Sequence, residues 1–317
     1  MSEGRAIALG FFDGVHLGHG ALLRRTVEAA GRGGLSSCAL TFDRHPEALI
    51  TKTAMPLLQT TGDRADLIRR LYAVDEVIFA HFEDSLMRMP WRQFLTDMLI
   101  GRFQAAHLVA GYDFHFGHRG EGNPERLAEE CARLGVGCDI IPRVELAGIT
   151  VSSTYIRKLV AQGDMERAAL FLGHPYSLSG VVTRGRQLGA SLGAPTVNLP
   201  LPEGLQCPAH GVYVSVCHVG GNALPAVTDV GLKPTVSLRR EAALETHILD
   251  FEGNLYGQSI RVDLLKFLRP ERLFPSTEEL REQIDRDIRA ARATHENSAA
   301  DKAESTERRG HTGCTQT

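Results

Sequence analysis

The fold of the N-terminal half is decided by the stretch Gly10-Phe11-Phe12-Asp13-Gly14-Val15-His16-Leu17-Gly18-His19. An apolar run before it, Ile7–Leu9, predicts a strand, and the apolar spacing after it, near Gly20–Ala30, predicts a helix. A strand that passes through a glycine-rich turn into a helix is typical of an open α/β sheet, in which ligands bind outside the carboxyl ends of the strands. The stretch therefore predicts a sheet of this kind and a ligand site at its edge.

The residue types of this stretch favour phosphate as the ligand. Free N–H groups and the dipole at a helix start attract anions, and Gly18 leaves room for a phosphate to approach the backbone. His16 and His19 lie three residues apart, so both can face one side of the opening turn. Two imidazoles there would stabilise the charge that develops on the α-phosphate of ATP as pyrophosphate leaves. We therefore predict a nucleotidyl-transfer site with His16 and His19 as catalytic residues.

The histidine pair is less well accounted for by chance or by zinc. An isolated His-x-x-His is mostly a chance pair in a turn, but the strand before it, the helix after it and the glycines favour a site. A zinc site would need more ligands, and no third ligand is evident in the sequence.

The rest of the first half continues the alternation of strands and helices. The further expected strands are Cys38–Phe42, Glu76–Ala80, His107–Gly111 and Cys138–Pro142. The further expected helices are Trp91–Ile100, Glu125–Leu134, Thr154–Ala161 and Met165–Leu172. This alternation predicts a mostly parallel sheet with helices on both faces, which we assign to a first domain, residues 1–173.

The pattern changes at Gly173–Ser177, after which helices no longer separate the strands. Six short strand-like pieces follow: Leu178–Thr183, Thr196–Leu199, Gly211–His218, Pro225–Val230, Glu245–Phe251 and Ser259–Leu265. They predict a small antiparallel β-barrel, closed by an amphipathic helix over about Thr277–Arg292. The second domain is then residues 174–292, and the polar remainder, 293–317, is expected to be a disordered tail.

The composition is that of an ordinary globular enzyme and narrows the partners. The chain has 317 residues and a formal net charge of -3, without the basic excess of a nucleic-acid binder. No run approaches the roughly 20 apolar residues that span a bilayer, so we expect no membrane partner. The six cysteines lack metal-site spacing and indicate reduced thiols in the cytoplasm. We expect small-molecule substrates and a monomer or weak homo-oligomer.

The opening stretch resembles the start of the bacterial FAD synthetases, the bifunctional riboflavin kinase/FMN adenylyltransferase family. Three further segments resemble the family's motifs in the same order: residues 41–46, 111–117 and 151–157. The resemblance implies a Rossmann-like nucleotidyltransferase domain that makes FAD from FMN and ATP. The residues implied in nucleotide binding are Phe12, Asp13, Gly14, Gly18, Asp113, Ser153, Thr154 and Arg157, and those implied in flavin binding are His45, Pro46 and Phe116. Taken alone, Ser153 and Thr154 are equally well explained as helix caps, with Arg157 solvated.

The second half resembles the riboflavin kinase module of the same family. Residues 193–198 are similar to its Gly-Phe-Pro-Thr-Ala-Asn motif, which implies Mg²⁺ at Thr196 and Asn198. Residues 245–251 are similar to its Glu-x-His-x-x-Asp-Phe run, which implies that Glu245 is the general base for the ribityl hydroxyl. Alternation along the strand alone would favour an outward-facing Glu245 without a function. Further implied contacts are Gly185 and Gly189 for the nucleotide, and Lys233, Pro234, Thr235 and Arg269 for the flavin.

The chain departs from the family's pattern at Phe11, Leu188, Ala190 and Ala194. The first departure removes a polar side chain beside the nucleotide, and two of the others remove cations from the kinase motif. The expected function is phosphorylation of riboflavin to FMN, followed by adenylylation of FMN to FAD, with ATP as co-substrate of both reactions. Two alternatives stay open: a nucleotidyltransferase for another acceptor, and a flavin-binding protein whose kinase site has decayed.

Overall fold

The computed structural model describes residues 4–45, 55–184, 195–234 and 240–311. The chain divides into two compact units. Unit 1 comprises Met1–Lys158, Leu170–His174 and Gly204–Gln206, and unit 2 comprises Leu159–Ala169, Pro175–Glu203 and Cys207–Thr317. One border between the units falls between residues 174 and 175, one residue beyond the expected change of domain, although residues 159–169 group with unit 2.

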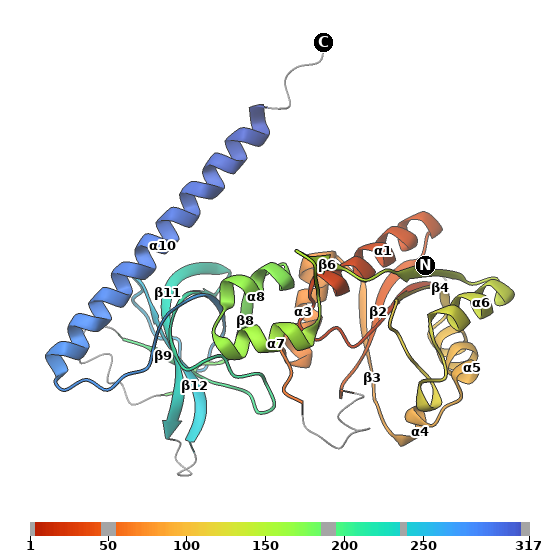
Figure 1. Ribbon diagram of the computed structural model, residues 1–317, viewed down its shortest axis with the longest axis horizontal. Coiled ribbons are helices and arrows are strands. Elements are labelled where there is room, and N and C mark those ends of the chain that lie inside the picture. The colour runs from red at the N-terminus through yellow and green to blue at the C-terminus, as the bar shows by residue number, and fades with distance from the viewer. Residues whose placement is uncertain (1–3, 46–54, 185–194, 235–239, 312–317) are drawn as a thin grey trace. The chain divides into compact units, whose positions relative to one another are not determined.

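Unit 1 is built around a five-stranded parallel sheet (Figure 1), as the sequence predicted. Its strands are β1 (Arg5–Leu9), β2 (Ser36–Phe42), β3 (Glu76–Ala80), β4 (Ala105–Gly111) and β5 (Gly137–Ile141). Their order is β3-β2-β1-β4-β5, so the chain reverses its direction of travel across the sheet between β1 and β4. Ligands of open α/β sheets bind at such a switch point, and the turn after β1 lies there.

Helices cover both faces of this sheet, because successive strand residues point to opposite sides. Ile7 and Leu9 of β1 pack with α5 (Trp91–Gln93), the π-helical segment η1 (Phe94–Arg102) and α6 (Pro124–Leu134). Ala8 packs on the other face with α1 (Leu17–Gly33) and α3 (Thr61–Tyr72). The smaller elements of this half are α4 (Asp84–Met87), η2 (His118–Gly120), β6 (Glu145–Leu146), β7 (Ile149–Thr150), α7 (Ser153–Gln162) and α8 (Met165–Leu172). Helix α3 was not predicted from the sequence.

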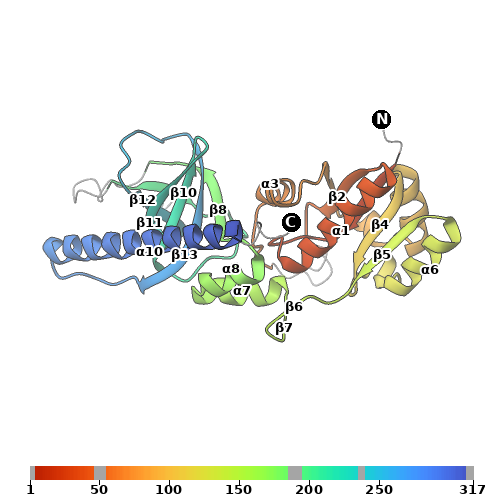
Figure 2. The same ribbon diagram turned by 90° about the horizontal axis from the view of Figure 1, so that it is seen from above.

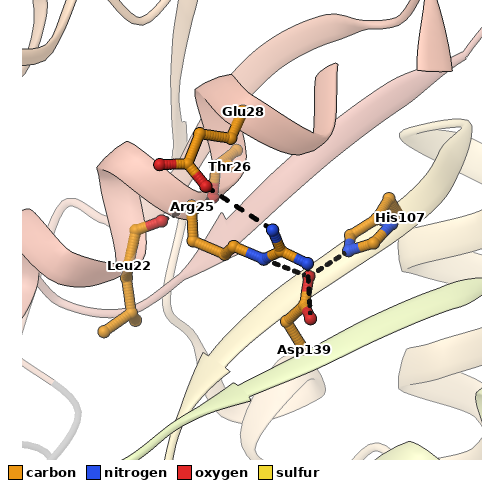
Figure 3. A network of polar contacts seen from close by, with 6 residues as sticks. All are labelled: Leu22, Arg25, Thr26, Glu28, His107 and Asp139. Atoms are coloured by element: carbon orange, nitrogen blue, oxygen red, sulfur yellow. Dashed lines mark hydrogen bonds and ion pairs between the residues drawn. The ribbon is translucent and has the colours of Figure 1, made fainter. Parts of the chain in front are cut away.

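A polar network fixes α1 to the strands beneath it (Figure 3). Arg25 of α1 donates to both carboxylate oxygens of Asp139 on β5, at 2.7 and 3.0 Å. His107 of β4 lies 2.7 Å from the same carboxylate through its Nε2. These contacts tie α1, whose first turn carries the histidine pair, to two strands at once.

Unit 2 contains a six-stranded antiparallel barrel that is nearly closed, as predicted. Its strands are β8 (Tyr176–Val181), β9 (Val197–Pro200), β10 (Gly211–Val219), β11 (Asn222–Pro234), β12 (Arg240–Ile248) and β13 (Ser259–Pro270). Their order is β8-β13-β10-β11-β12-β9, and a bridge between Thr183 and Asn198 joins the two edges. Inside the barrel, the hydroxyl groups of Ser215, Thr228 and Thr246 form a buried chain of contacts of 2.7 and 2.9 Å.

The last helix, α10 (Thr277–His311), packs across the outer face of the barrel (Figure 2). Ala291 and Ile288 of α10 contact Val212, Val214 and Val227 of the barrel. The expectation that the helix ends at Arg292 and gives way to a disordered tail is wrong, because α10 continues to His311. Residues 293–309 contain no Gly or Pro and are rich in Ala, Glu, Lys and Arg, which favour helix without any apolar periodicity. None of the helices in the described part of the chain combines the length and apolarity needed to cross a membrane.

Candidate functional site

The turn between β1 and α1 is held in an unusual backbone conformation. Phe12, Gly14 and Val15 all have positive φ, at 57°, 85° and 42°. Positive φ is strained for phenylalanine and valine, so the surrounding structure must enforce it. The N–H of Val15 donates to the carbonyl of Phe12 at 3.1 Å, and both side chains are fully buried. The tight turn places His16 directly before the first turn of α1.

His16 and His19 lie face to face. Their ring centroids are 3.6 Å apart and their planes differ by 11°. His16 caps α1, because its Nδ1 accepts a hydrogen bond of 3.2 Å from the backbone N–H of His19. A Cβ on Gly18 would lie 3.1 Å from the His16 ring, so glycine at this position leaves space for the imidazole itself. The expected convergence of the two histidines is therefore present.

Both imidazoles are neutral at physiological pH. His16 is 7% exposed, and burial lowers its pKa to about 3. Burial also lowers the pKa of His19 well below its usual value, and the nearby His16 and Arg64 lower it further. The Nδ1 atom of His19 is buried without a hydrogen-bond partner. A neutral pair can give N–H groups to phosphate oxygens without first losing a proton.

Asp13 ties the turn to helix α7. Its Oδ2 accepts from Arg157 Nη2 at 2.7 Å, and its Oδ1 accepts from the N–H of Leu58 at 2.9 Å. Its carbonyl accepts from the hydroxyl of Ser153 at 2.8 Å. Asp13 is 1% exposed, so its carboxylate is committed to these bonds and does not face a nucleotide. The ion pair instead places the start of α7, with Ser153 and Thr154, beside the histidine turn.

A second buried cation, missed by the sequence analysis, stands at the other side of this turn. Arg64 of α3 is fully buried, and its Nη1 donates to the carbonyls of Phe11 and Phe42 at 2.9 and 3.0 Å. It also donates to the hydroxyl of Thr41 at 3.1 Å. Its Nε and Nη2 are buried without a partner. The guanidinium lies 4.2 Å from the centre of the Phe11 ring, and that ring packs edge-on against His45 at 4.4 Å.

Three other predicted contacts in unit 1 are corrected by burial. Phe12 is fully buried against His19, so its side chain cannot touch a nucleotide. Gly14 is packed under Leu58, which a Cβ would meet at 2.6 Å, and phosphate has no room there. Phe116 lies in the core, 7% exposed, with its ring against Trp91, Phe94 and Phe114. Asp113 is exposed just after β4, as a nucleotide contact would require, and Pro46 lies outside the described residues.

The predicted kinase residues of unit 2 lie in one row across the barrel. Asn198 of β9 lies opposite Glu245 of β12, which lies opposite Asp229 of β11. The row continues through Val212 of β10 to Arg269 of β13. Directly opposed residues of a sheet share one face. The pairing thus brings together the proposed metal ligand, base and flavin contact, which are far apart in sequence.

This row faces a cavity of about 590 Å³ between the barrel and α10. Glu245, Asp229 and Arg269 line the cavity together with Ile284 and Ile288 of α10. Arg269 is anchored there by Asp287 of α10, which accepts from its Nε and Nη2 at distances down to 2.7 Å. Pocket size and mixed lining are those of a small-molecule site. Within unit 2 the sequence therefore predicted the site residues but not the part that α10 plays.

A smaller cavity of about 180 Å³ adjoins this one at Thr196, which lines both. Tyr256 and Phe251 form its aromatic side. The backbone of Lys233 and Pro234 forms the end of β11, whereas Thr235, Gly185 and Gly189 lie outside the described residues. Among the described residues, no three His, Cys, Asp or Glu side chains gather as a metal cage.

Comparison with known proteins assigns both halves. Residues 1–155 match the FAD synthetase family, and residues 172–295 match the riboflavin kinase family. Proteins named bifunctional riboflavin kinase/FMN adenylyltransferase are similar along almost the whole chain. The protein from Pseudomonas fluorescens is 34% identical, covering 94% of this chain and 95% of its own. That from Escherichia coli K12 is 35% identical and that from Listeria monocytogenes 32%, each with at least 91% of both chains covered.

One solved structure is similar over the same extent. A Streptococcus pneumoniae protein, described as a macrolide-efflux protein, superposes with a TM-score of 0.81 at 27% identity. The match covers 92% of this chain and 95% of the other. The two-unit architecture is therefore shared with an experimentally determined chain.

Proposed function

The chain belongs to the bifunctional riboflavin kinase/FMN adenylyltransferase family, and from that premise we propose how its residues carry out the two reactions. Both reactions use ATP as co-substrate. Unit 2 phosphorylates riboflavin to FMN, and unit 1 transfers AMP from a second ATP to FMN, which releases pyrophosphate. The observation that carries this division is that each unit holds its own polar site, the histidine pair in one and the Asn198–Glu245–Arg269 row in the other.

In unit 1, a phosphate oxygen of FMN attacks the α-phosphorus of ATP. The bond from that phosphorus to the leaving pyrophosphate breaks, and no covalent enzyme intermediate is needed. His16 and His19 donate N–H groups to the α-phosphate oxygens, where negative charge grows in the transition state. The start of α7, with the N–H groups near Ser153 and Thr154, receives the leaving pyrophosphate. Arg157 strengthens the positive field there through its buried position, and Gly18 and exposed Asp113 border the nucleotide.

In unit 2, Glu245 accepts the proton of the riboflavin 5′-hydroxyl as that oxygen attacks the γ-phosphorus of ATP. The bond that breaks joins the γ-phosphorus to the leaving ADP oxygen. Arg269 holds the flavin in the 590 Å³ cavity, and Thr196 stands where this cavity meets the smaller one. A hydroxyl at that junction can contact a phosphoryl group that passes from nucleotide to flavin. Lys233, Pro234, Thr235, Gly185 and Gly189 complete this proposal on resemblance alone, as do His45 and Pro46 in unit 1.

The donor set of the kinase site suits Mg²⁺. Thr196, Asn198 and Glu245 offer hydroxyl, amide and carboxylate oxygens, which are the hard ligands that Mg²⁺ prefers. A site without an all-protein cage also fits, because Mg²⁺ keeps several waters and shares substrate phosphates. We propose that Thr196 and Asn198 hold the ion, which would offset phosphate charge when bound.

The surroundings proposed for the enzyme follow from its chemistry. Cys38, Cys131, Cys138, Cys207 and Cys217 carry free thiols, which suits a reducing cytoplasm. Substrates are small molecules, and the enzyme acts as a monomer or weak homo-oligomer.

Product analysis tests the whole proposal. The full chain is incubated with riboflavin, ATP and Mg²⁺, and the flavins are separated by chromatography. We expect FMN first and FAD later, and absence of both overturns the proposal. FAD from added FMN, without any FMN from riboflavin, would instead show a decayed kinase site. Transfer of AMP to another acceptor but not to FMN, in a parallel acceptor screen, would show a different nucleotidyltransferase.

A further inference from the structure

Arg64 is the largest fully buried side chain of the described residues and has no role in the mechanism above. It belongs to α3, whose first turn is capped by Thr60. Its Nη1 is shared among the carbonyls of Phe11 and Phe42 and the hydroxyl of Thr41, within 3.1 Å of each. Phe11 follows β1, and Phe42 ends β2. The guanidinium thus lies at the carboxyl ends of two adjacent strands, where an open α/β sheet binds ligands.

The opposite edge of the same guanidinium is unsatisfied. Nε and Nη2 are buried and have no hydrogen-bond partner. No carboxylate among the described residues forms an ion pair with Arg64, and the nearby carboxylate of Asp13 is occupied by Arg157 and Leu58. Buried donors without partners destabilise the fold, so a native protein that retains them usually does so for a function. The Nε–Nη2 edge is the fork that binds a phosphate or carboxylate through two parallel bonds.

The neighbours of this edge belong to the adenylyltransferase site. His19 is close enough that the charge of Arg64 lowers its pKa, and the Nδ1 of His19 is a further buried atom without a partner. The Phe11 ring lies over the guanidinium at 4.2 Å, and His45 packs edge-on against that ring at 4.4 Å. An unpaired cationic fork, an imidazole and two flat rings therefore meet on the β1–β2 side of the turn.

We propose that Arg64 is a phosphate-binding residue of the adenylyltransferase site, whose Nε–Nη2 edge holds the phosphate group of FMN. This inference rests on the function proposed above. The attacking phosphate must lie beside the α-phosphate that the histidine pair holds, and Arg64 adjoins that pair. The start of α7, tied to the turn through Asp13, is assigned to the leaving pyrophosphate, which leaves the β1–β2 side for the acceptor. The fork is closed to solvent, so the phosphate reaches it after the Phe11 and His45 rings shift.

The chemical benefit is electrostatic. The phosphate of FMN is an anion that must approach the polyphosphate of ATP, and a fixed guanidinium offsets their repulsion. Arg64 exchanges no proton in this role, because guanidinium remains charged at every relevant pH. The effect should appear in the affinity for FMN, whereas a contact to ATP would appear in the affinity for ATP.

Arg64→Lys in the full chain tests the proposal, because lysine keeps the charge and loses the fork. The KM values for FMN and for ATP are measured separately in FAD formation. We expect the KM for FMN to rise about tenfold or more, as loss of one charge-assisted bond implies, and the KM for ATP to stay within about twofold. Thr41→Val is the matched control, because it removes one acceptor of Nη1 without touching the fork. Its KM for FMN should stay near the wild-type value.

Three results would overturn the inference. A raised KM for ATP with an unchanged KM for FMN would assign Arg64 to the nucleotide. A fall in kcat alone, or equal effects of Arg64→Lys and Thr41→Val, would make Arg64 purely a brace for the turn. If Arg64→Lys does not fold, a crystal structure of the wild-type chain with FMN and a non-hydrolysable ATP analogue decides, since a phosphate of FMN away from Nε and Nη2 excludes the role. Failure of the wild-type chain to form FAD would instead refute the proposed function itself.

Discussion

The backbone N–H of His19 donates to Nδ1 of His16, and this bond fixes the tautomer of His16. With a pKa lowered to about 3 by burial, His16 is neutral, and a neutral imidazole that accepts at Nδ1 must carry its proton on Nε2. The helix cap therefore turns His16 into an N–H donor of known direction. The face-to-face packing at 3.6 Å aligns His19 with it.

Loss of His19 should remove FAD formation and spare FMN formation. In His19→Ala, one donor to the α-phosphate is missing, and we expect adenylylation to fall about 10²–10³-fold, as for other oxyanion donors. Phosphorylation of riboflavin by the same preparation should be unchanged. His115→Ala, in an exposed loop of the same unit, is the control and should retain both activities. Equal loss of FMN and FAD would contradict separate sites.

The two buried imidazoles should also make unit 1 sensitive to acid. Because the pKa of His16 is about 3 in the folded state and about 6.5 when unfolded, the unfolded state binds the proton first. The stabilisation is fully present above pH 6.5 and is lost as the pH falls toward 3, by up to about 1.4 kcal/mol per pH unit. His16→Gln, which keeps an acceptor for the His19 N–H, should flatten this dependence.

The single tryptophan of the chain makes the measurement specific to unit 1. Trp91 is 8% exposed in its core, so its fluorescence follows urea unfolding of that unit. Midpoints are compared at pH 7.5, 6 and 5 for the wild type, His16→Gln and the exposed control His115→Gln. Parallel curves for wild type and His16→Gln would show that His16 is not the titrating group.

The buried pair of Asp13 and Arg157 should act as one unit in stability. Asp13→Asn leaves the Arg157 guanidinium buried, 8% exposed, without its counter-charge, and we expect a loss of about 3–5 kcal/mol in the Trp91 transition. Arg157→Met should be similarly costly, and the double variant should lose much less than the sum. Additive losses in this double-mutant cycle would show that the two side chains are not coupled.

The strand–helix alternation sufficed to predict the parallel sheet, and the Gly and Pro spacing predicted the barrel. Helix α3 was missed because its charged residues hide the apolar face of Ala65, Leu67 and Ile68. Arg64 was missed with it. The Thr60 cap, three residues before Asp63, was the available signal.

The candidate site was predicted where function depends on spacing and missed where it depends on tertiary packing. His16 and His19 face each other because a helix brings positions three apart together. That Phe12 and Phe116 are buried rather than at the ligand depends on helices packed over them, which a local motif does not encode. The partnership of Asn198 with Glu245 depends on the register of β9 and β12, residues 47 apart in sequence.

Glu245 should be needed for FMN formation alone. Glu245→Gln keeps the size of the side chain and removes the base, so we expect riboflavin phosphorylation to fall about 10²–10⁴-fold. Adenylylation of added FMN by unit 1 should be unchanged. Asp250→Asn is a matched control on the same segment, because that exposed carboxylate pairs with Arg292 and does not line the cavity. Unchanged phosphorylation in Glu245→Gln would exclude Glu245 as the base.

Helix α10 should hold the flavin cavity open through the contact of Asp287 with Arg269. Asp287→Asn weakens two-point anchoring of a guanidinium that is 19% exposed, and removal of one partner from such a pair costs about 3 kcal/mol when it is well buried. Arg269 is then free to leave the cavity wall, so the KM for riboflavin should rise while the KM for FMN in adenylylation stays constant. Hydrogen exchange should speed up in β13 and at the N-terminal turns of α10, and the Trp91 transition of unit 1 should not move. If riboflavin affinity is unchanged although exchange is faster, Arg269 holds the helix and does not bind flavin.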